Sequence, residues 1–207
     1  MPSRSAHHAG RAQQLRRHIA LEAARLMSEH AIRDFHLAKR KAAERLGASE
    51  DIGLPTNSEI EQALREHQRL FQATEQPVRL RRLREVARDA MRFFERFEPR
   101  LLGAVLDGTA DRHSAVCLHL FSDSPEEVAG FLQEQGIPYK EQNRRLRVSH
   151  DAQQEYPVLL FSADDTAIDL TVLPHDAIRQ APLDRVGERP MRRATLTALE
   201  ELLAADP

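Results

Sequence analysis

The spacing of apolar residues changes at Pro99, and this change constrains the fold of the chain more than any other feature. Before it, apolar residues recur at every third or fourth position, as they do on one face of an α-helix. After it, they come in short or alternating runs, which are typical of β-strands. The sequence therefore predicts an α+β fold, with a helical region at residues 12–98 and an α+β domain at residues 99–207. Residues 1–11 are predicted to form a disordered tail.

In the first half, helices are predicted at residues 13–46, with a break near 28–33, and at residues 58–72 and 77–97. Ser58 has Glu61 three positions later, which is the spacing of a capping box, although Asn57 is also a good capping residue. The first half is thus expected to be helical throughout.

The second half is predicted to mix strands and helices. The expected elements are a strand at 115–121, a helix at 124–136, a hairpin of 137–140 with 144–148, a hairpin of 158–161 with 167–173, and a helix at 191–203. Ser124 and Pro125 are suited to the N-cap and first position of the first of these helices. The apolar run at 101–106 fits either a strand or the end of a helix.

Composition limits the classes of protein that the chain can belong to. No run approaches the roughly 18 apolar residues of a transmembrane helix, so no membrane association is expected. The polar, basic start argues against a secretory signal, and the single cysteine, Cys117, fits a reducing cytoplasm. Residues 1–50 carry 10 Lys and Arg against 5 Asp and Glu, whereas the rest carries 20 against 27. The N-terminal helices are therefore the basic end, where a polyanion or a protein partner would dock.

Residues 102–121 combine an apolar run, the pair Gly108-Thr109 and a strand that begins near Ser114. This order resembles the nucleotidyltransferase superfamily, which has a DNA polymerase β-like fold. The motif of that superfamily is an apolar element, Gly-Ser or Gly-Thr, a short helical stretch and a strand reading Asp-apolar-Asp, with a third carboxylate on a later strand. The resemblance implies a mixed sheet with flanking helices, a nucleotide held by Gly108, Thr109 and Ser114, and Asp169 as the remaining catalytic carboxylate.

The chain departs from this motif at both aspartates of the strand, where Ala115 and Cys117 stand. The motif's carboxylates hold two metal ions that clamp the attacking and leaving oxygens. Alanine cannot bind a metal, and the soft thiol of cysteine suits Mg²⁺ poorly. We therefore expect a catalytically degenerate protein without a metal or cofactor, which binds a nucleotide, RNA or a protein. In the alternative, an active transferase uses Asp169 with another acid, and Mg²⁺ is then required.

Cys117 and His119 alternate with apolar residues, so they are expected to share one face of a strand with Ala115. Together with Asp169, they could form a thiol–imidazole–carboxylate site or a zinc site. The simpler interpretation, which we favour, is a buried cysteine beside a half-exposed histidine.

Arginines crowd the helix at Arg79–Arg92 and the segment Arg144–Arg147. They could contact phosphates of RNA or a nucleotide. Because the basic residues are interleaved with acids, ion pairs on a solvated surface are the favoured interpretation. The segments IRDFHLAKRKAAERLG and LPTNSEIEQALREHQRLF also resemble a bacterial protein family of unassigned function. A third hypothesis is a structural or interaction module whose N-terminal helices dock a partner or a second copy, with the oligomeric state left open.

Overall fold

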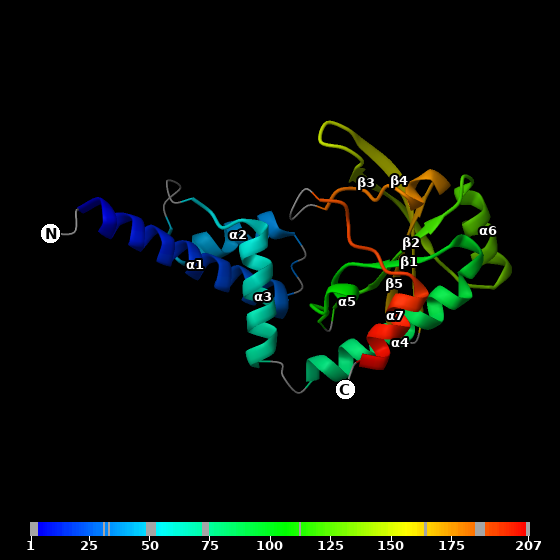
Figure 1. Cartoon of the computed structure of the whole chain (residues 1–207), viewed down its shortest axis with the longest axis horizontal. Coiled ribbons are helices and arrows are strands. Elements are labelled where there is room, and N and C mark those ends of the chain that lie inside the picture. The colour runs from blue at the N-terminus through cyan, green and yellow to red at the C-terminus, as the bar shows by residue number, and fades with distance from the viewer. Residues whose placement is uncertain are drawn as a thin grey trace. The chain divides into compact units, whose positions relative to one another are not determined.

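The chain forms two compact units (Figure 1). The computed structural model describes residues 4–30, 32, 34–48, 53–71, 75–111, 113–163, 165–184 and 189–205. The first unit comprises residues 1–73 with 185–187, and the second comprises residues 74–184 with 188–207. The predicted boundary at 98 is therefore wrong: the helix that precedes it belongs with the sheet.

The first unit consists of α1 (Arg4–His30), α2 (Phe35–Arg45) and α3 (Asn57–Phe71). Helix α1 begins at Arg4, so the predicted tail is helical over its described residues, while residues 1–3 lie outside them. The predicted break is confirmed: α1 ends at His30, and Asp34 caps α2 by accepting a hydrogen bond from the Leu37 amide at 2.8 Å. A cluster of small and aliphatic residues, including Ile19 and Ile60, forms the core between the three helices.

Helix α3 is capped by a residue that the sequence analysis did not select. The Glu59 amide donates to Thr56 Oγ1 at 3.2 Å, and the Thr56 amide donates to Glu59 Oε2 at 2.6 Å. This reciprocal pair is a capping box. It lies two residues before the box predicted at Ser58 and Glu61.

The second unit is a two-layer α+β domain around a mixed five-stranded sheet in the order β1-β2-β5-β4-β3 (Figure 1). Its strands are β1 (Arg100–Leu102), β2 (Val116–Phe121), β3 (Lys140–Arg147), β4 (Gln153–Ala163) and β5 (Thr166–Leu173). Its helices are α4 (Glu75–Phe93), α5 (Ala104–Asp107), α6 (Pro125–Glu134) and α7 (Leu196–Ala205), with short 3-10 turns at Glu95–Phe97 and His175–Ile178. The meander β3-β4-β5 folds back so that β5 lies parallel to β2, while all other pairs are antiparallel.

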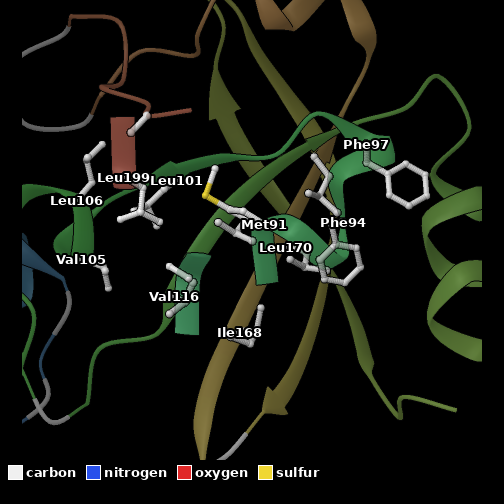
Figure 2. Close-up of a cluster of buried hydrophobic side chains, with 14 of the residues drawn as sticks. Met91, Phe94, Phe97, Leu101, Val105, Leu106, Val116, Ile168, Leu170 and Leu199 are labelled. Atoms are coloured by element: carbon white, nitrogen blue, oxygen red, sulfur yellow. The ribbon is translucent and has the colours of Figure 1, made fainter. Parts of the chain in front are cut away.

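The helices α4, α6 and α7 all cover one face of the sheet. Figure 2 shows Met91 and Phe94, from α4 and its end, packed with Val116, Ile168 and Leu170 from β2 and β5. Because α4 contributes this apolar face, it is part of the sheet's core, which explains why the boundary falls before it. We call the other side of the sheet, which α4, α6 and α7 do not cover, the open face. It carries Cys117, His119, Asp169 and Thr171, and the last three are at most 7% exposed.

Two predicted elements of the second half need correction. Residues 140–147 form one strand, which pairs with β4, and not half of a hairpin between 137–140 and 144–148. The last helix begins at Leu196 and not at Met191, because Ala194 instead pairs with Leu101 of the edge strand β1 through two backbone hydrogen bonds. The predicted strand 115–121, the helix after Ser124 and the hairpin of β4 with β5 are confirmed. Asp164, in the predicted turn of that hairpin, lies outside the described residues.

Candidate functional site on the open face of the sheet

The parallel neighbours β2 and β5 bring the chemically reactive residues of the open face together. Cys117 lies beside Asp169 and His119 beside Thr171, because these are partners in the strand register. Side chains alternate along a strand, so the apolar residues between them point to the helical layer. The predicted shared face of Cys117 and His119 and the predicted proximity of Asp169 are thus confirmed.

Asp169 is bound by an arginine that lies two strands away. Arg144 of β3 reaches across β4, and its two terminal nitrogens donate to the two carboxylate oxygens of Asp169 at 3.0 and 2.7 Å. One of these nitrogens also donates to Thr171 Oγ1 at 3.1 Å. Asp169 is only 7% exposed, so this bidentate pair is largely shielded from water.

The pair fixes the charge state of the arginine. Burial alone would lower the pKa of Arg144 and is the largest single influence on it. The hydrogen bonds and negative charge of Asp169 outweigh burial, so the pKa of Arg144 is raised. The carboxylate therefore has a permanent cation as its partner, and a metal ion would have to displace that cation to bind Asp169.

His119, which was expected to be half-exposed, is buried within this face. The residue is 2% exposed, and its Nδ1 atom has no hydrogen-bond partner among the described residues. Burial lowers the pKa of His119 to about 3, with further contributions from the positive charges of Arg193 and Arg144. The imidazole is therefore neutral at physiological pH.

Two further arginines give the open face a positive character. Arg193 stacks over the ring of Phe121 and donates to the backbone carbonyls of Ala177 and Ile178 at 2.9 and 2.7 Å. Arg100, the register partner of His119, donates to the carbonyls of Glu98 and Pro99. In the described parts of the chain, neither arginine pairs with a carboxylate. Burial lowers the pKa of Arg193, and the charge of Arg100 lowers it further, so the two cations repel each other.

The open face does not offer the metal site considered from the sequence. Within the described ranges, no group of three or more His, Cys, Asp or Glu side chains is arranged to hold a metal ion. Cys117 is half-buried, and its Sγ lies 3.8 Å from the carbonyl oxygen of Ala115 as a weak donor. Asp169 is engaged by Arg144, so it is not oriented as the third member of a thiol–imidazole–carboxylate site.

The residues predicted to hold a nucleotide lie away from Asp169. Gly108 forms the C-cap of α5 with φ +76°, and a Cβ atom there would lie 3.8 Å from Leu80 of α4. The Thr109 amide donates to the carbonyl of Ala104 at 2.9 Å and closes the same turn. The predicted order of a Gly-Thr pair followed by a short helix is therefore reversed: the short helix comes first, and the pair packs towards α4.

Ser114 is separated from the open face as well. Its hydroxyl donates to Asp111 Oδ1 at 3.0 Å and accepts from the Asp111 amide at 2.9 Å, which fixes the loop before β2. Ser114 precedes β2 and lines a hollow together with Leu83 of α4, which belongs to the core on the helical side of the sheet. Of the four residues predicted for the site, only Asp169 lies on the open face.

Gly103 is a neighbour of the site that the sequence analysis missed. It directly follows β1, has φ +74°, and a Cβ atom on it would lie 4.0 Å from the Cβ of Cys117. Such a backbone conformation favours glycine, and a lone glycine inside an apolar run is the sequence signal that could have revealed it.

Several arginines outside the open face are paired with acids, as favoured from the sequence. The pairs along α4 are Arg81 with Glu85, Arg88 with Asp89 and Arg92 with Glu200. On β3, Arg145 points away from its neighbour Arg144 and pairs with Glu155 at 2.7 Å. These exposed pairs contribute little to stability or to a binding site.

Comparison with known proteins assigns no family to the chain. Searches of protein-family models, curated proteins and solved structures gave no match to the chain. Across the residues that the structure describes, no helix is both long enough and apolar enough to cross a membrane.

Proposed function

We propose that the chain is a catalytically inactive, nucleotidyltransferase-like protein that binds a nucleotide on the open face without a metal ion. The bidentate pair of Arg144 with Asp169 is the observation that carries this proposal. The one carboxylate left from the motif is neutralised by a fixed guanidinium. The chain has thus replaced a metal ion by an arginine at the same carboxylate.

The order of elements around Gly103 also resembles the nucleotidyltransferase motif, with the glycine of the motif at Gly103 instead of Gly108. The motif runs from an apolar element through a glycine pair and a short helical stretch to a strand. Here β1 is followed by Gly103-Ala104, then α5, then β2. Gly103 therefore takes the place assigned from the sequence to Gly108. In this alignment Ala104 stands where the motif has serine or threonine. The chain therefore differs from the motif at Ala104 as well as at Ala115 and Cys117.

The side chains of the open face argue against nucleotidyl transfer and for nucleotide binding. Two-metal catalysis requires several free carboxylate oxygens, and Ala115, Cys117 and a paired Asp169 do not supply them. Arg100, Arg144 and Arg193 bring three positive charges to the face that carries Asp169. Guanidinium groups are the preferred protein partners of phosphates, so a nucleotide is the ligand we favour.

The test measures binding of each of ATP, GTP, CTP and UTP by calorimetry and by thermal shift, with and without Mg²⁺ or Mn²⁺. We expect one or more nucleotides to stabilise the protein without metal, because a ligand that binds only the folded state raises its melting temperature. Arg144→Gln should weaken this binding, whereas Arg145→Gln should not, because Arg145 lies on the other side of the same strand. The double variant Arg144→Gln/Asp169→Asn separates loss of binding from the instability of an unpaired Asp169.

Each other outcome points to one of the alternatives. A nucleotide response that requires Mg²⁺ or Mn²⁺ would overturn the loss of the metal site and favour an active transferase that uses Asp169. No response to any nucleotide would overturn nucleotide binding and favour RNA or a protein partner at the N-terminal helices. A cytoplasmic location belongs to this proposal and is supported by the single cysteine in the sequence.

A further inference from the structure

A groove on the surface of the first unit lies where α1 packs against α3, and its volume is about 520 Å³. Ala20 of α1 and Ala63 of α3 line it, and both also belong to the core of the unit. Leu21 lines the groove beside them and is 38% exposed. The groove therefore combines small side chains, over which another helix can approach closely, with an exposed aliphatic side chain.

The charged residues of this groove balance one another. Its lining contains two arginines and two glutamates. Arg16 and Glu59 form an ion pair with each other, with 2.8 Å between Arg16 Nη2 and Glu59 Oε2. Arg17 on α1 and Glu66 on α3 make no ion pair with any described residue, and Glu66 accepts only a hydrogen bond from Gln62 at 3.4 Å. One helix thus presents an unpaired cation to the groove, and the other presents an unpaired anion.

This distribution of charge indicates the kind of partner that fits. A polyanion such as RNA would meet the carboxylate of Glu66 as well as the guanidinium of Arg17, so it is not favoured. In a two-fold dimer, by contrast, the same surface of both copies meets, and each residue contacts the residue that contacts it. A two-fold axis that runs along the groove brings α1 of each copy over α3 of the other, and Arg17 then lies opposite Glu66. The groove is therefore complementary in charge to a second copy of itself.

The small core of the first unit gives a second reason for a partner. Six of the ten buried residues in its described apolar cluster are alanines, which bury less apolar surface than larger aliphatic residues. Units of fewer than roughly 80 residues seldom have a core that is sufficient alone, and oligomerisation is one way in which they gain stability. The first unit, residues 1–73 with 185–187, is of this size. A second copy over the groove would cover Leu21 and extend the core.

We propose that the chain forms a homodimer in which the α1–α3 grooves of two copies face each other. Leu21 of each copy packs over Ala20 and Ala63 of the other, and Arg17 of each copy pairs with Glu66 of the other. The apolar contacts supply most of the affinity, because exposed ion pairs contribute little. The charged pairs fix the orientation of the two copies.

Sedimentation equilibrium of the full chain, from micromolar to near-millimolar concentration, tests this proposal. We expect an equilibrium between monomer and dimer. Leu21→Gln should raise the dissociation constant by about tenfold or more, because a leucine side chain is no longer buried on association. Leu54→Gln is the matched control, because Leu54 is a leucine of the first unit that is 45% exposed and lies outside the groove. This variant should dimerise as the wild type does.

Two charge reversals test the orientation of the copies. Arg17→Glu and Glu66→Arg each place like charges opposite each other at both ends of the interface, so each should raise the dissociation constant by about tenfold or more. Circular dichroism shows that each variant is folded. An equal mixture of the two variants restores opposite charges at both contacts, so we expect a dimer with one copy of each.

Three results would overturn the proposal: a monomer at every concentration, an equal effect of Leu21→Gln and Leu54→Gln, or a mixture of the two charge variants that stays monomeric. A monomer at every concentration would leave the groove to a different protein. The nucleotide site proposed on the open face belongs to the second unit. Arg17→Glu should therefore keep the nucleotide response, and Arg144→Gln should keep the dimer. Either proposal can thus fail without the other.

Discussion

Arg144 and Asp169 form an ion pair whose side chains are 31% and 10% exposed, respectively. Removing one partner of a shielded pair leaves the other charge unpaired in a poorly solvated place. We expect Arg144→Leu to lower the free energy of unfolding by about 2–3 kcal/mol, less than for a fully buried pair, because the guanidinium is partly open to water. Urea denaturation followed by circular dichroism measures this loss.

Two further variants show whether the stability lost in Arg144→Leu arises from the unpaired charge of Asp169. Arg145→Leu removes an arginine whose pair with Glu155 is exposed on both sides, so it should cost less than about 1 kcal/mol. The double variant Arg144→Leu/Asp169→Leu removes both charges and should recover most of the stability. If the double variant is as unstable as Arg144→Leu, packing of the arginine stem, and not its charge, stabilises the site.

His119 is expected to make the stability of the second unit depend on pH. The pKa of His119 is lowered to about 3 in the folded chain, whereas an unfolded histidine titrates near 6.5. Between these values the unfolded state binds a proton that the folded state excludes, so stability is complete above pH 6.5 and falls as the pH drops towards 3. The slope should reach at most about 1.4 kcal/mol per pH unit.

His119→Leu removes the titrating group and should flatten the pH dependence between pH 6 and pH 4. Urea denaturation at each pH measures the free energy of unfolding of both proteins. Hydrogen exchange of peptides from β2 and β5 shows whether the change lies in the second unit. His150→Gln, at an exposed histidine, is the control and should leave the slope unchanged. If the free energy of unfolding depends on pH with the same slope in the wild type and in His119→Leu, the imidazole is protonated in the folded state.

At the scale of single elements, the limits of sequence reasoning are visible in β3 and in the turn after β1. Alternating apolar residues predicted β2 and β5, and with them the shared face of Cys117 and Asp169. Residues 140–145 of the edge strand β3 are all polar, so no alternation marked them as one strand, and Arg144 was not placed beside Asp169. Their contact spans 25 positions in sequence and depends on the order of strands, which local patterns do not contain.

At the start of α3, the cap predicted from the sequence differs from the cap in the structure, and substitutions can distinguish the two. Thr56 and Glu59 form the capping box, so Thr56→Ala should cost about 1 kcal/mol, because it removes the side-chain acceptor of the Glu59 amide. Ser58→Ala, at the cap predicted from the sequence, should change stability by less than half of that amount. Hydrogen exchange of the first turn of α3 measures both effects. A larger effect at Ser58 would restore the predicted cap.

At the scale of the whole molecule, the sequence predicted a helical part and a mixed part but placed the boundary one helix too late. Helical periodicity does not show which core a helix joins. The apolar residues of α4 lie in the core of the sheet, whereas those of α1 and α3 lie in a separate cluster. None of the described residues belongs to both clusters, so each unit has an apolar core of its own.

Separate cores predict that a cavity in one unit leaves the other unit stable. Met91 and Ile19 are both fully buried, one in each core. Met91→Ala and Ile19→Ala should each lower the stability of their own unit by about 2–5 kcal/mol, because a buried side chain is replaced by a cavity. Hydrogen exchange of the full chain should show faster exchange in the sheet for Met91→Ala and in α1 and α3 for Ile19→Ala, with the two effects additive in the double variant. Faster exchange throughout the chain in both single variants would mean that the two cores unfold as one cooperative unit.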